Sequence, residues 1–272
     1  MSIRLPTLRH SPRPQQGYTL LELLVALFIG IFLLVGLFTI LQNTRRSSSN
    51  QTVLSQLQDQ QRMAMSMLTD VIQNAGYFDP NTITSAAALP AAASAQQPAV
   101  NHALLASQGM SGADATAGDT ILVRYATNGT SSAAPDGLEN CNGGTSTSAA
   151  TYVNTFYIAS TTSGGLTTYA LYCSLDGGNT TGIPLVTGVE NMQIYYGVST
   201  VAAANNVDTY MTAAQVQAST GGWASVTSVR VTLAFVNPLY GQAGYTAATS
   251  QYVYLTRVIP VQGRTGVIAT AL

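Results

Sequence analysis

Very few residues in this chain are of the types that carry catalysis or metal binding. Its 272 residues include two histidines and two cysteines, and no lysine at all. A structural zinc site usually needs four such ligands, and P-loops and Schiff-base enzymes need a lysine. The GxSxG and GxGxxG patterns are also absent from the sequence. We therefore expect a protein that is not an enzyme and that holds no metal and no cofactor.

The two cysteines, Cys141 and Cys173, lie in a Ser/Thr-rich part of the chain with little charge, a composition common in exported proteins. We favour a disulfide between them. It would close a loop of about 33 residues and stabilise the fold by about 3 to 4 kcal/mol. Two buried free thiols are the alternative, because sequence alone does not bring the two α-carbons within bridging distance.

The acidic residues raise the question of a calcium site. In SLDGGNTTG, residues 174–182, Asp176 precedes several oxygen-bearing side chains. A Ca²⁺ site needs about six to eight oxygen ligands and usually several carboxylates, so a glycine-rich hairpin is the simpler interpretation. Four other acids are interpreted as solvated loop residues: Asp114, Asp119, Asp136 and Glu139.

Glu22 lies inside a long apolar run. The residues from Leu20 to Leu41 are apolar or small except for Glu22 and Thr39. As a helix with a rise of about 1.5 Å per residue, this run spans about 33 Å, which is enough to cross a bilayer. An ionised carboxylate in a membrane costs roughly 2 to 3 kcal/mol on insertion scales. Glu22 therefore either reaches the interface near the helix N-terminus or has a partner of opposite charge.

The basic residues around this run favour one orientation. Arg4, Arg9 and Arg13 precede it and favour a cytoplasmic N-terminus, although Arg45 and Arg46 follow it and reduce the asymmetry. The chain after residue 45 would then lie outside the cytoplasm. Charged residues are only 8% of the sequence, with no basic patch, so nucleic-acid binding is disfavoured.

The N-terminal arrangement resembles the class III signal of type IV prepilins and pseudopilins. A basic leader is followed by QQGYTLLE at residues 15–22 and then by the apolar run. The resemblance implies that a prepilin peptidase cleaves between Gly17 and Tyr18, removes the leader 1–17 and N-methylates Tyr18, which stands where the family usually has phenylalanine. It also implies that Glu22 recruits the next subunit, because two unlike charges in a membrane can neutralise each other.

The elements that position these residues are a long helix and a sheet. After the polar residues 42–51, apolar residues return at helical spacing, and Gly76 and Pro80 mark the end. We expect a helix over 18–76, with its transmembrane segment at about 20–41 and its second half packed on protein. The apolar face consists of Val53, Leu57, Ala64, Leu68, Val71 and Ala75.

The remainder, 77–272, is expected to be a mainly β globular domain. Runs rich in β-branched residues and tyrosine predict strands at 120–126, 151–159, 166–173, 190–198, 227–236 and 251–261. The last two can pair antiparallel, and alternation predicts a buried face at Val229, Val231, Leu233 and Phe235. Two Ala/Ser-rich stretches, 83–119 and 127–150, predict long surface loops, the first with a short helix near 102–106. The expected fold class is α+β and type IV pilin-like, with a long helix packed on a mainly antiparallel sheet.

Three further segments sharpen the resemblance to the PilW family of minor pilins: LTDVIQNAGYFDP at 68–80, LVTGVENMQIYYGV at 185–198 and VTSVRVTLAFV at 226–236. The resemblance implies a minor pilin that helps to initiate the type IV pilus and lies at or near its tip, supporting twitching motility and adhesion. The implied partners are other minor pilins, the major pilin, a PilY-type tip adhesin, the prepilin peptidase and the inner-membrane assembly platform. The implied location is a single pass of the inner membrane with a periplasmic domain, and then the pilus (fimbrium) at the cell surface.

Two other functions stay open on the sequence. A J-type pseudopilin of type II secretion shares the same helix and a related sheet domain. A surface- or DNA-binding module of the pilus is supported only by the neutral polar loops.

Overall fold

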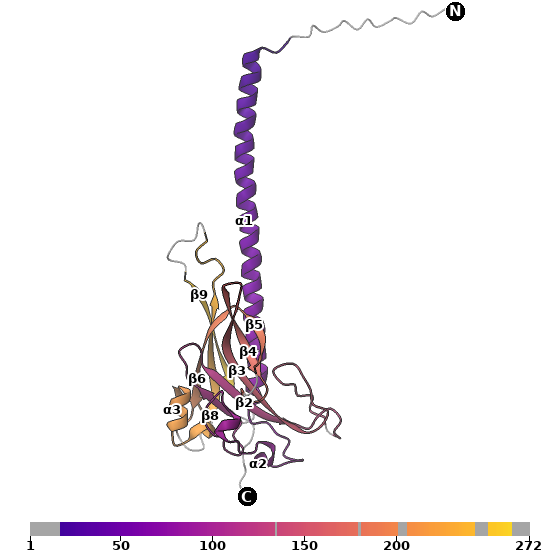
Figure 1. Ribbon diagram of the computed structural model, residues 1–272, viewed down its shortest axis with the longest axis vertical. Coiled ribbons are helices and arrows are strands. Elements are labelled where there is room, and N and C mark those ends of the chain that lie inside the picture. Colours follow the sequence, from indigo (N-terminus) through magenta and orange to yellow (C-terminus); the bar gives the residue numbers. More distant parts are fainter. Residues whose placement is uncertain (1–16, 134, 179–180, 201–205, 243–249, 263–272) are drawn as a thin grey trace, which may run out of the picture. The chain divides into compact units, whose positions relative to one another are not determined.

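The computed structural model describes residues 17–133, 135–178, 181–200, 206–242 and 250–262. Contacts within the chain divide it into two compact units, Met1–Thr52 and Val53–Leu272, and each unit is described by itself. One helix, α1 (Leu20–Gln73), passes from the first unit into the second (Figure 1).

In the first unit α1 is a bare apolar helix. Its large apolar side chains from Leu20 to Leu41 are all exposed, and an 18-residue window has a mean hydropathy of 3.0 with none of it buried. By length and composition this segment can cross a membrane.

In the second unit α1 buries one face. The buried residues are Leu57, Ala64, Met65, Leu68, Val71 and Ile72, followed by Ala75 beyond the helix end. They include spacings of three, four and seven, which are those of one helical stripe. The sequence predicted this face from Leu57 onward, whereas Val53, its first predicted residue, is only half-buried. Gly76 follows with φ of +79°, a conformation that costs glycine little, and its N–H donates to the Arg124 carbonyl at 2.8 Å.

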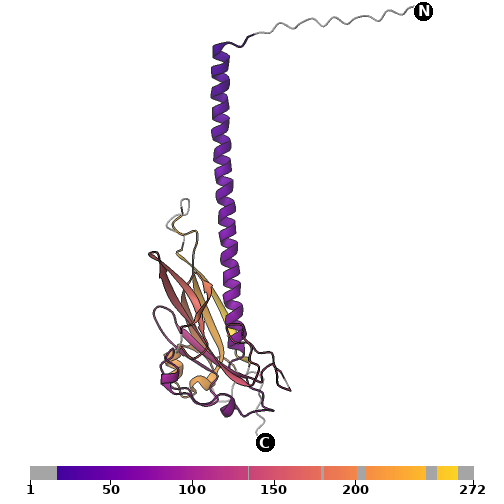
Figure 2. The same cartoon turned by 45° about the vertical axis from the view of Figure 1, so that its right-hand side comes forward.

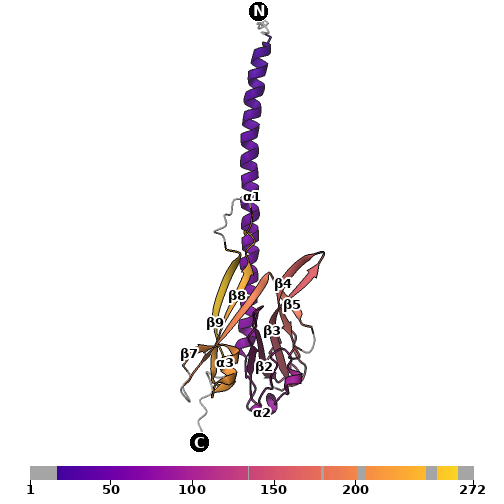
Figure 3. The same cartoon turned by 60° about the vertical axis from the view of Figure 1, so that its left-hand side comes forward.

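The strands form two antiparallel sheets, where the sequence suggested one. The first sheet has the order β1-β2-β3-β4-β5 and the second has the order β7-β6-β8-β9 (Figures 1 and 3). The strands of the first are β1 (Met110–Ala113), β2 (Thr120–Thr127), β3 (Ala150–Ser163), β4 (Leu166–Ser174) and β5 (Ile183–Thr187). Those of the second are β6 (Val189–Val198), β7 (Thr209–Met211), β8 (Val226–Val236) and β9 (Tyr252–Pro260).

All six strands predicted from the sequence are present, and β8 pairs antiparallel with β9 as predicted. Leu233, for example, lies opposite Leu255. The strands that were not predicted are the shortest three: β1, β5 and β7.

The second half of α1 lies beside the strands (Figure 2), and one apolar core joins it to both sheets. It contains Leu68 and Ile72 from α1, Phe156 from β3 and the predicted inner face of β8, whose four residues Val229, Val231, Leu233 and Phe235 are fully buried. Burial of these apolar side chains away from water drives the packing of the helix on the sheets.

Gly188 joins the two sheets at the single residue between β5 and β6. Its N–H donates to the Tyr169 carbonyl at 2.8 Å, and its own carbonyl accepts from the Val236 N–H at 3.0 Å. Gly188 has φ of +80°, so the chain can turn from one sheet into the other there with little strain.

The prediction of a plain surface loop at 83–119 is wrong in part. The segment contains α2 (Ser85–Ala88), a 3₁₀ turn η1 (Ser94–Gln96) and β1. The predicted short helix near 102–106 is not formed; Leu104 is buried there and makes an isolated antiparallel bridge to Ala92.

Arg124 explains why this Ala/Ser-rich segment is ordered. Its guanidinium, only 2% exposed, donates to the carbonyls of Pro90, Leu105 and Gln108. These carbonyls gain a charged donor in place of water. Burial lowers the pKa of Arg124 to about 10, so the side chain still carries its charge at neutral pH.

Three of the acids predicted to be solvated instead accept hydrogen bonds from backbone N–H groups. Asp114 accepts from the first two N–H groups of α3 (Ala213–Ala218), at 2.8 and 3.0 Å. Asp119 accepts from the N–H groups of Ala115 and Ile194, and its partial burial raises the pKa of its carboxyl. Asp136 likewise accepts two backbone N–H groups of its own loop. Loop N–H groups outside the sheet ladders need such acceptors, which is why these acids are not freely solvated.

Candidate processing and assembly site

The residues expected to be processed lie just before α1. Gly17 and Tyr18 have no helical or strand structure, Tyr18 is 81% exposed, and nothing lies within 4 Å of the position of a β-carbon on Gly17. The peptide bond between them is therefore accessible within the chain as described.

Thr19 starts the helix. Its carbonyl accepts from the N–H groups of Glu22 and Leu23 at 3.0 and 3.3 Å, and its hydroxyl oxygen accepts from the Glu22 N–H at 3.3 Å. This is an N-cap, which satisfies donors that have no partner inside the helix. The spacing Thr19-x-x-Glu22 is a helix-start signal that the sequence analysis did not use.

Glu22 is thereby fixed in the first turn of α1, with its side chain exposed. The helix N-terminus carries partial positive charge, which favours a carboxylate there. Among the described residues no ion pair to Glu22 is recorded, and the next charged side chain along the helix is Arg45, about 35 Å away at about 1.5 Å per residue. Within the described residues, the favourable charge beside this carboxylate is therefore the partial charge of the helix N-terminus.

The helix is continuous through the middle of the apolar segment. The hydroxyl of Thr39 donates to the Val35 carbonyl at 2.9 Å, four residues back, and Gly30 and Gly36 do not interrupt the helix. Of the buried core residues of the second unit, Leu57 is the earliest in sequence.

Cys141 and Cys173 are joined in a disulfide, as the sequence favoured. Their α-carbons are 6.3 Å apart and both side chains are buried. Cys173 belongs to β4, and the Cys141 N–H donates to the Asn154 side-chain oxygen of β3 at 2.8 Å. The bridge therefore holds the 127–150 connection against the first sheet.

The strands on either side of the segment SLDGGNTTG, β4 and β5, pair antiparallel, which is the arrangement a hairpin requires; residues 179 and 180 lie outside the described residues. The Ser174 hydroxyl donates to the Asp176 carboxylate at 2.7 Å. Across the part of the chain that the structure describes, no group of three His, Cys, Asp or Glu side chains is placed to hold a metal ion.

Two family models match the chain. Residues 155–265 match the family described as type IV pilus-assembly protein W, and residues 12–38 match the prokaryotic N-terminal methylation motif. The first match contains the segments 185–198 and 226–236, whereas 68–80 lies outside it. The second contains Gly17, Tyr18 and Glu22. No curated protein and no solved structure matches the chain.

Proposed function

We propose that this chain is a minor pilin of the PilW family, which helps to initiate assembly of the type IV pilus and lies at or near its tip. The observation that supports this most is the presence of both matches on one chain. A methylation motif precedes a bare apolar helix, and a PilW-type sheet domain follows it. A subunit of this kind would contact other minor pilins, the major pilin and a PilY-type adhesin, and would support motility and adhesion.

The proposed maturation has two steps at adjacent residues. The prepilin peptidase hydrolyses the bond between Gly17 and Tyr18, and the new amino group of Tyr18 is methylated. The accessibility of Gly17 and the exposure of Tyr18 support this assignment. The mature chain then starts two residues before α1, so its amino group is on the residue four positions before Glu22.

Before assembly the protein would span the inner membrane once through 20–41. Arg4, Arg9 and Arg13 favour a cytoplasmic leader, which gives a periplasmic sheet domain by the positive-inside rule. The 18–76 helix and the 77–272 domain would then be the parts that enter the pilus at the cell surface.

Glu22 is proposed to attract the methylated amino group of the neighbouring subunit. In the membrane, pairing the two charges is less costly than burying either alone. We expect Glu22→Ala to be cleaved normally at Gly17 but to enter sheared pili at a level about tenfold lower than wild type, measured by immunoblot of the pilus fraction.

The matched control is Asp59→Ala, which removes an exposed acid from the polar part of the same helix. It should leave incorporation unchanged. Normal incorporation of Glu22→Ala after normal cleavage would show that the carboxylate does not recruit subunits.

Deletion of the gene distinguishes a role in the type IV pilus from a role in type II secretion. We expect the deletion strain to lose surface pili by electron microscopy and twitching motility on agar, with protein secretion intact. Loss of secretion with normal pili would assign the chain to the J-type pseudopilins instead.

A further inference from the structure

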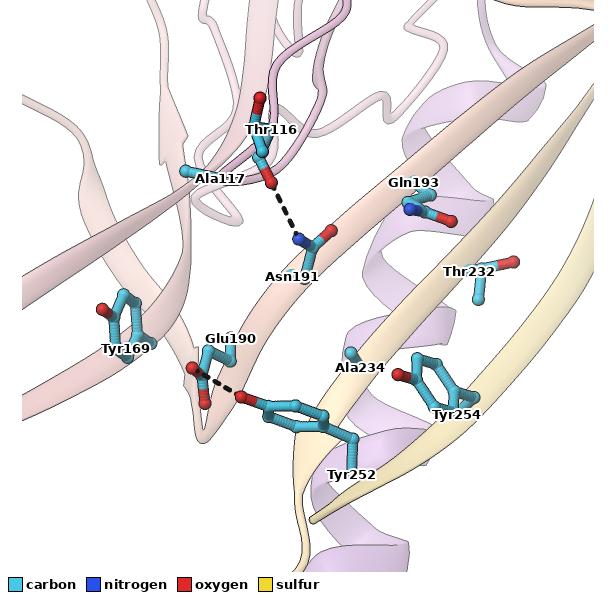
Figure 4. A pocket seen from close by; sticks show the side chains of 10 residues that line it. All are labelled: Thr116, Ala117, Tyr169, Glu190, Asn191, Gln193, Thr232, Ala234, Tyr252 and Tyr254. Carbon is cyan, nitrogen blue, oxygen red and sulfur yellow. Dashed lines mark hydrogen bonds between the residues drawn. The ribbon is translucent and has the colours of Figure 1, made fainter. Parts of the chain in front are cut away.

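A groove lies on the outward face of the second sheet, away from α1 (Figure 4). The core side chains of β8 point inward, so Thr232 and Ala234 alternate to the other face. The strand register places Asn191 and Tyr254 on either side of Ala234, and Gln193 beside Thr232. The cavity has a volume of about 310 Å³, within the usual range of small-molecule sites.

The side chains of the groove are held in place. Tyr252 donates its hydroxyl to Glu190 at 2.8 Å, and the Asn191 amide donates to the Thr116 carbonyl at 3.2 Å, so strand β9 and the loop before β2 are both tied to β6. Tyr169 enters from the first sheet, next to the Gly188 junction. Figure 4 shows Tyr169 on one side of Glu190, and Tyr252 and Tyr254 on the other.

Several polar groups of the groove keep bonding capacity. Glu190 uses one carboxylate oxygen for Tyr252 and retains the other. Within the described chain no hydrogen bond is recorded for the Gln193 amide or for the Tyr254 hydroxyl, and the Tyr254 ring is 64% exposed. The neighbouring Thr116, Ala117, Thr232 and Ala234 are small and leave space above the rings.

The charge of the groove selects against anions. Glu190 is its only charged lining residue, and no arginine lines it among the described residues. Arg230 lies two residues from Thr232 on the same face of β8, but its guanidinium stacks over the rings of Tyr195 and Tyr210, at 4.7 and 4.6 Å, and does not line the groove. A phosphate, a nucleic acid or a sialylated glycan would therefore bring negative charge against the Glu190 carboxylate with no cation in the lining to compensate it.

A neutral saccharide fits the remaining chemistry. A sugar ring has an apolar C–H face, which can lie on a tyrosine ring, and hydroxyls on its edge, which are matched by planar carboxylate and amide groups. We propose that this groove binds a neutral saccharide, with Tyr254 under the ring and Glu190 and Gln193 at its hydroxyls. The proposal does not depend on where in a pilus the chain lies.

The test uses the mature full-length chain in a polyoxyethylene detergent, because sugar-based detergents would compete for the site. The probe is an array of neutral glycans ending in glucose, galactose or N-acetylglucosamine, with sialylated versions of the same glycans beside them. We expect binding to one or more neutral glycans and weaker binding to the sialylated versions. Binding to none of the neutral glycans, or preference for the sialylated ones, overturns the proposal.

Variants then locate the site. Tyr254→Ala and Gln193→Ala should each raise the Kd for the best neutral glycan about tenfold, whereas Tyr254→Phe, which keeps the ring, should change it less than about threefold. Tyr240→Ala is the matched control, since Tyr240 is a half-exposed tyrosine outside the groove. Thermal unfolding of each variant checks the fold. Unchanged glycan binding by both Tyr254→Ala and Gln193→Ala would place the site elsewhere and overturn the proposal.

Discussion

Single polar residues organise the segments of this protein that have the least regular sequence. Arg124 holds the carbonyls of Pro90, Leu105 and Gln108, and Asp114 and Asp119 hold N–H groups of distant segments. Composition shows that the segment 83–119 is rich in alanine and serine, but it does not show which distant charge satisfies its backbone. That is why the sequence predicted a loop there and solvated acids beside it.

Asp119 should make stability depend on pH. Its folded-state pKa is raised by partial burial, so the folded state binds the proton more tightly than the unfolded state in the window from the ordinary Asp pKa up to the raised value. The contribution of Asp119 to stability is therefore greatest below this window and decreases as the pH rises through it.

We accordingly expect Asp119→Asn to be less stable than wild type at pH 7, because an amide cannot accept from both N–H groups that Asp119 holds. The difference in free energy of unfolding between wild type and the variant should become larger at pH 4. Wild type gains stability there by protonation of Asp119, and the variant has no carboxyl at this position to protonate. Urea unfolding at the two pH values, followed by the fluorescence of the single tryptophan Trp223, measures it. A difference that shrinks on acidification would mean that the hydrogen bonds, not burial, dominate the pKa.

Elements with a long and regular sequence pattern were predictable. The strand β8 alternates over its whole length, and the α1 stripe from Leu57 to Val71 follows helical spacing, so burial of one face determines both. The missed strands are short and carry weak signals: β1 contains a glycine, β5 contains Pro184, and β7 has three residues. These short strands form because a neighbouring strand pairs with them, and the local sequence pattern does not predict that pairing.

The end of α1 meets the first sheet at two glycines. A β-carbon on Gly109 would lie 2.3 Å from the Gly76 nitrogen and 2.4 Å from its α-carbon, both backbone atoms. The residue after Gly109 starts β1, so this contact sets how close the helix end comes to the sheet edge.

We expect Gly109→Ala to destabilise the second unit by about 3 kcal/mol, because the backbone has to move apart. Gly137→Ala is the comparison: it has open space around it and φ of +64°, so only local strain of about 1 kcal/mol is expected. Urea unfolding of the two variants gives both values. Equal losses of unfolding free energy in the two variants would show that the backbone at the Gly76–Gly109 contact can move apart at little energetic cost.

At the scale of the whole molecule, the fold class could be predicted and the groove could not. The N-terminal signal and the alternating strands occupy continuous segments, whereas Tyr169, Glu190 and Tyr254 are far apart in sequence. The order of two sheets and the Gly188 junction bring them together. If the same strands are assumed to form a single sheet, the position of Tyr169 relative to Glu190 and Tyr254 is not determined.

The disulfide links the long 127–150 connection to β4. Replacing both cysteines by alanine should lower the free energy of unfolding by about 3 to 4 kcal/mol, because the unfolded chain regains the freedom of a loop of about 33 residues. Reduction of wild type with dithiothreitol should give a similar loss in urea unfolding. Loss below about 1 kcal/mol in both experiments would show that the connection is held mainly by contacts such as that of Cys141 with Asn154.

The exposed start of the helix has a chemical consequence in a chain without lysine. Once the leader is removed, the α-amino group of Tyr18 is the one amine in the whole protein, because every other basic side chain is arginine or histidine. Reductive alkylation with isotopic formaldehyde adds two labelled methyl groups to a primary amine and one to an amine that already carries a methyl group. A mass spectrum of the intact labelled protein would therefore report the maturation state of every copy of the subunit, without digestion and without background from side chains.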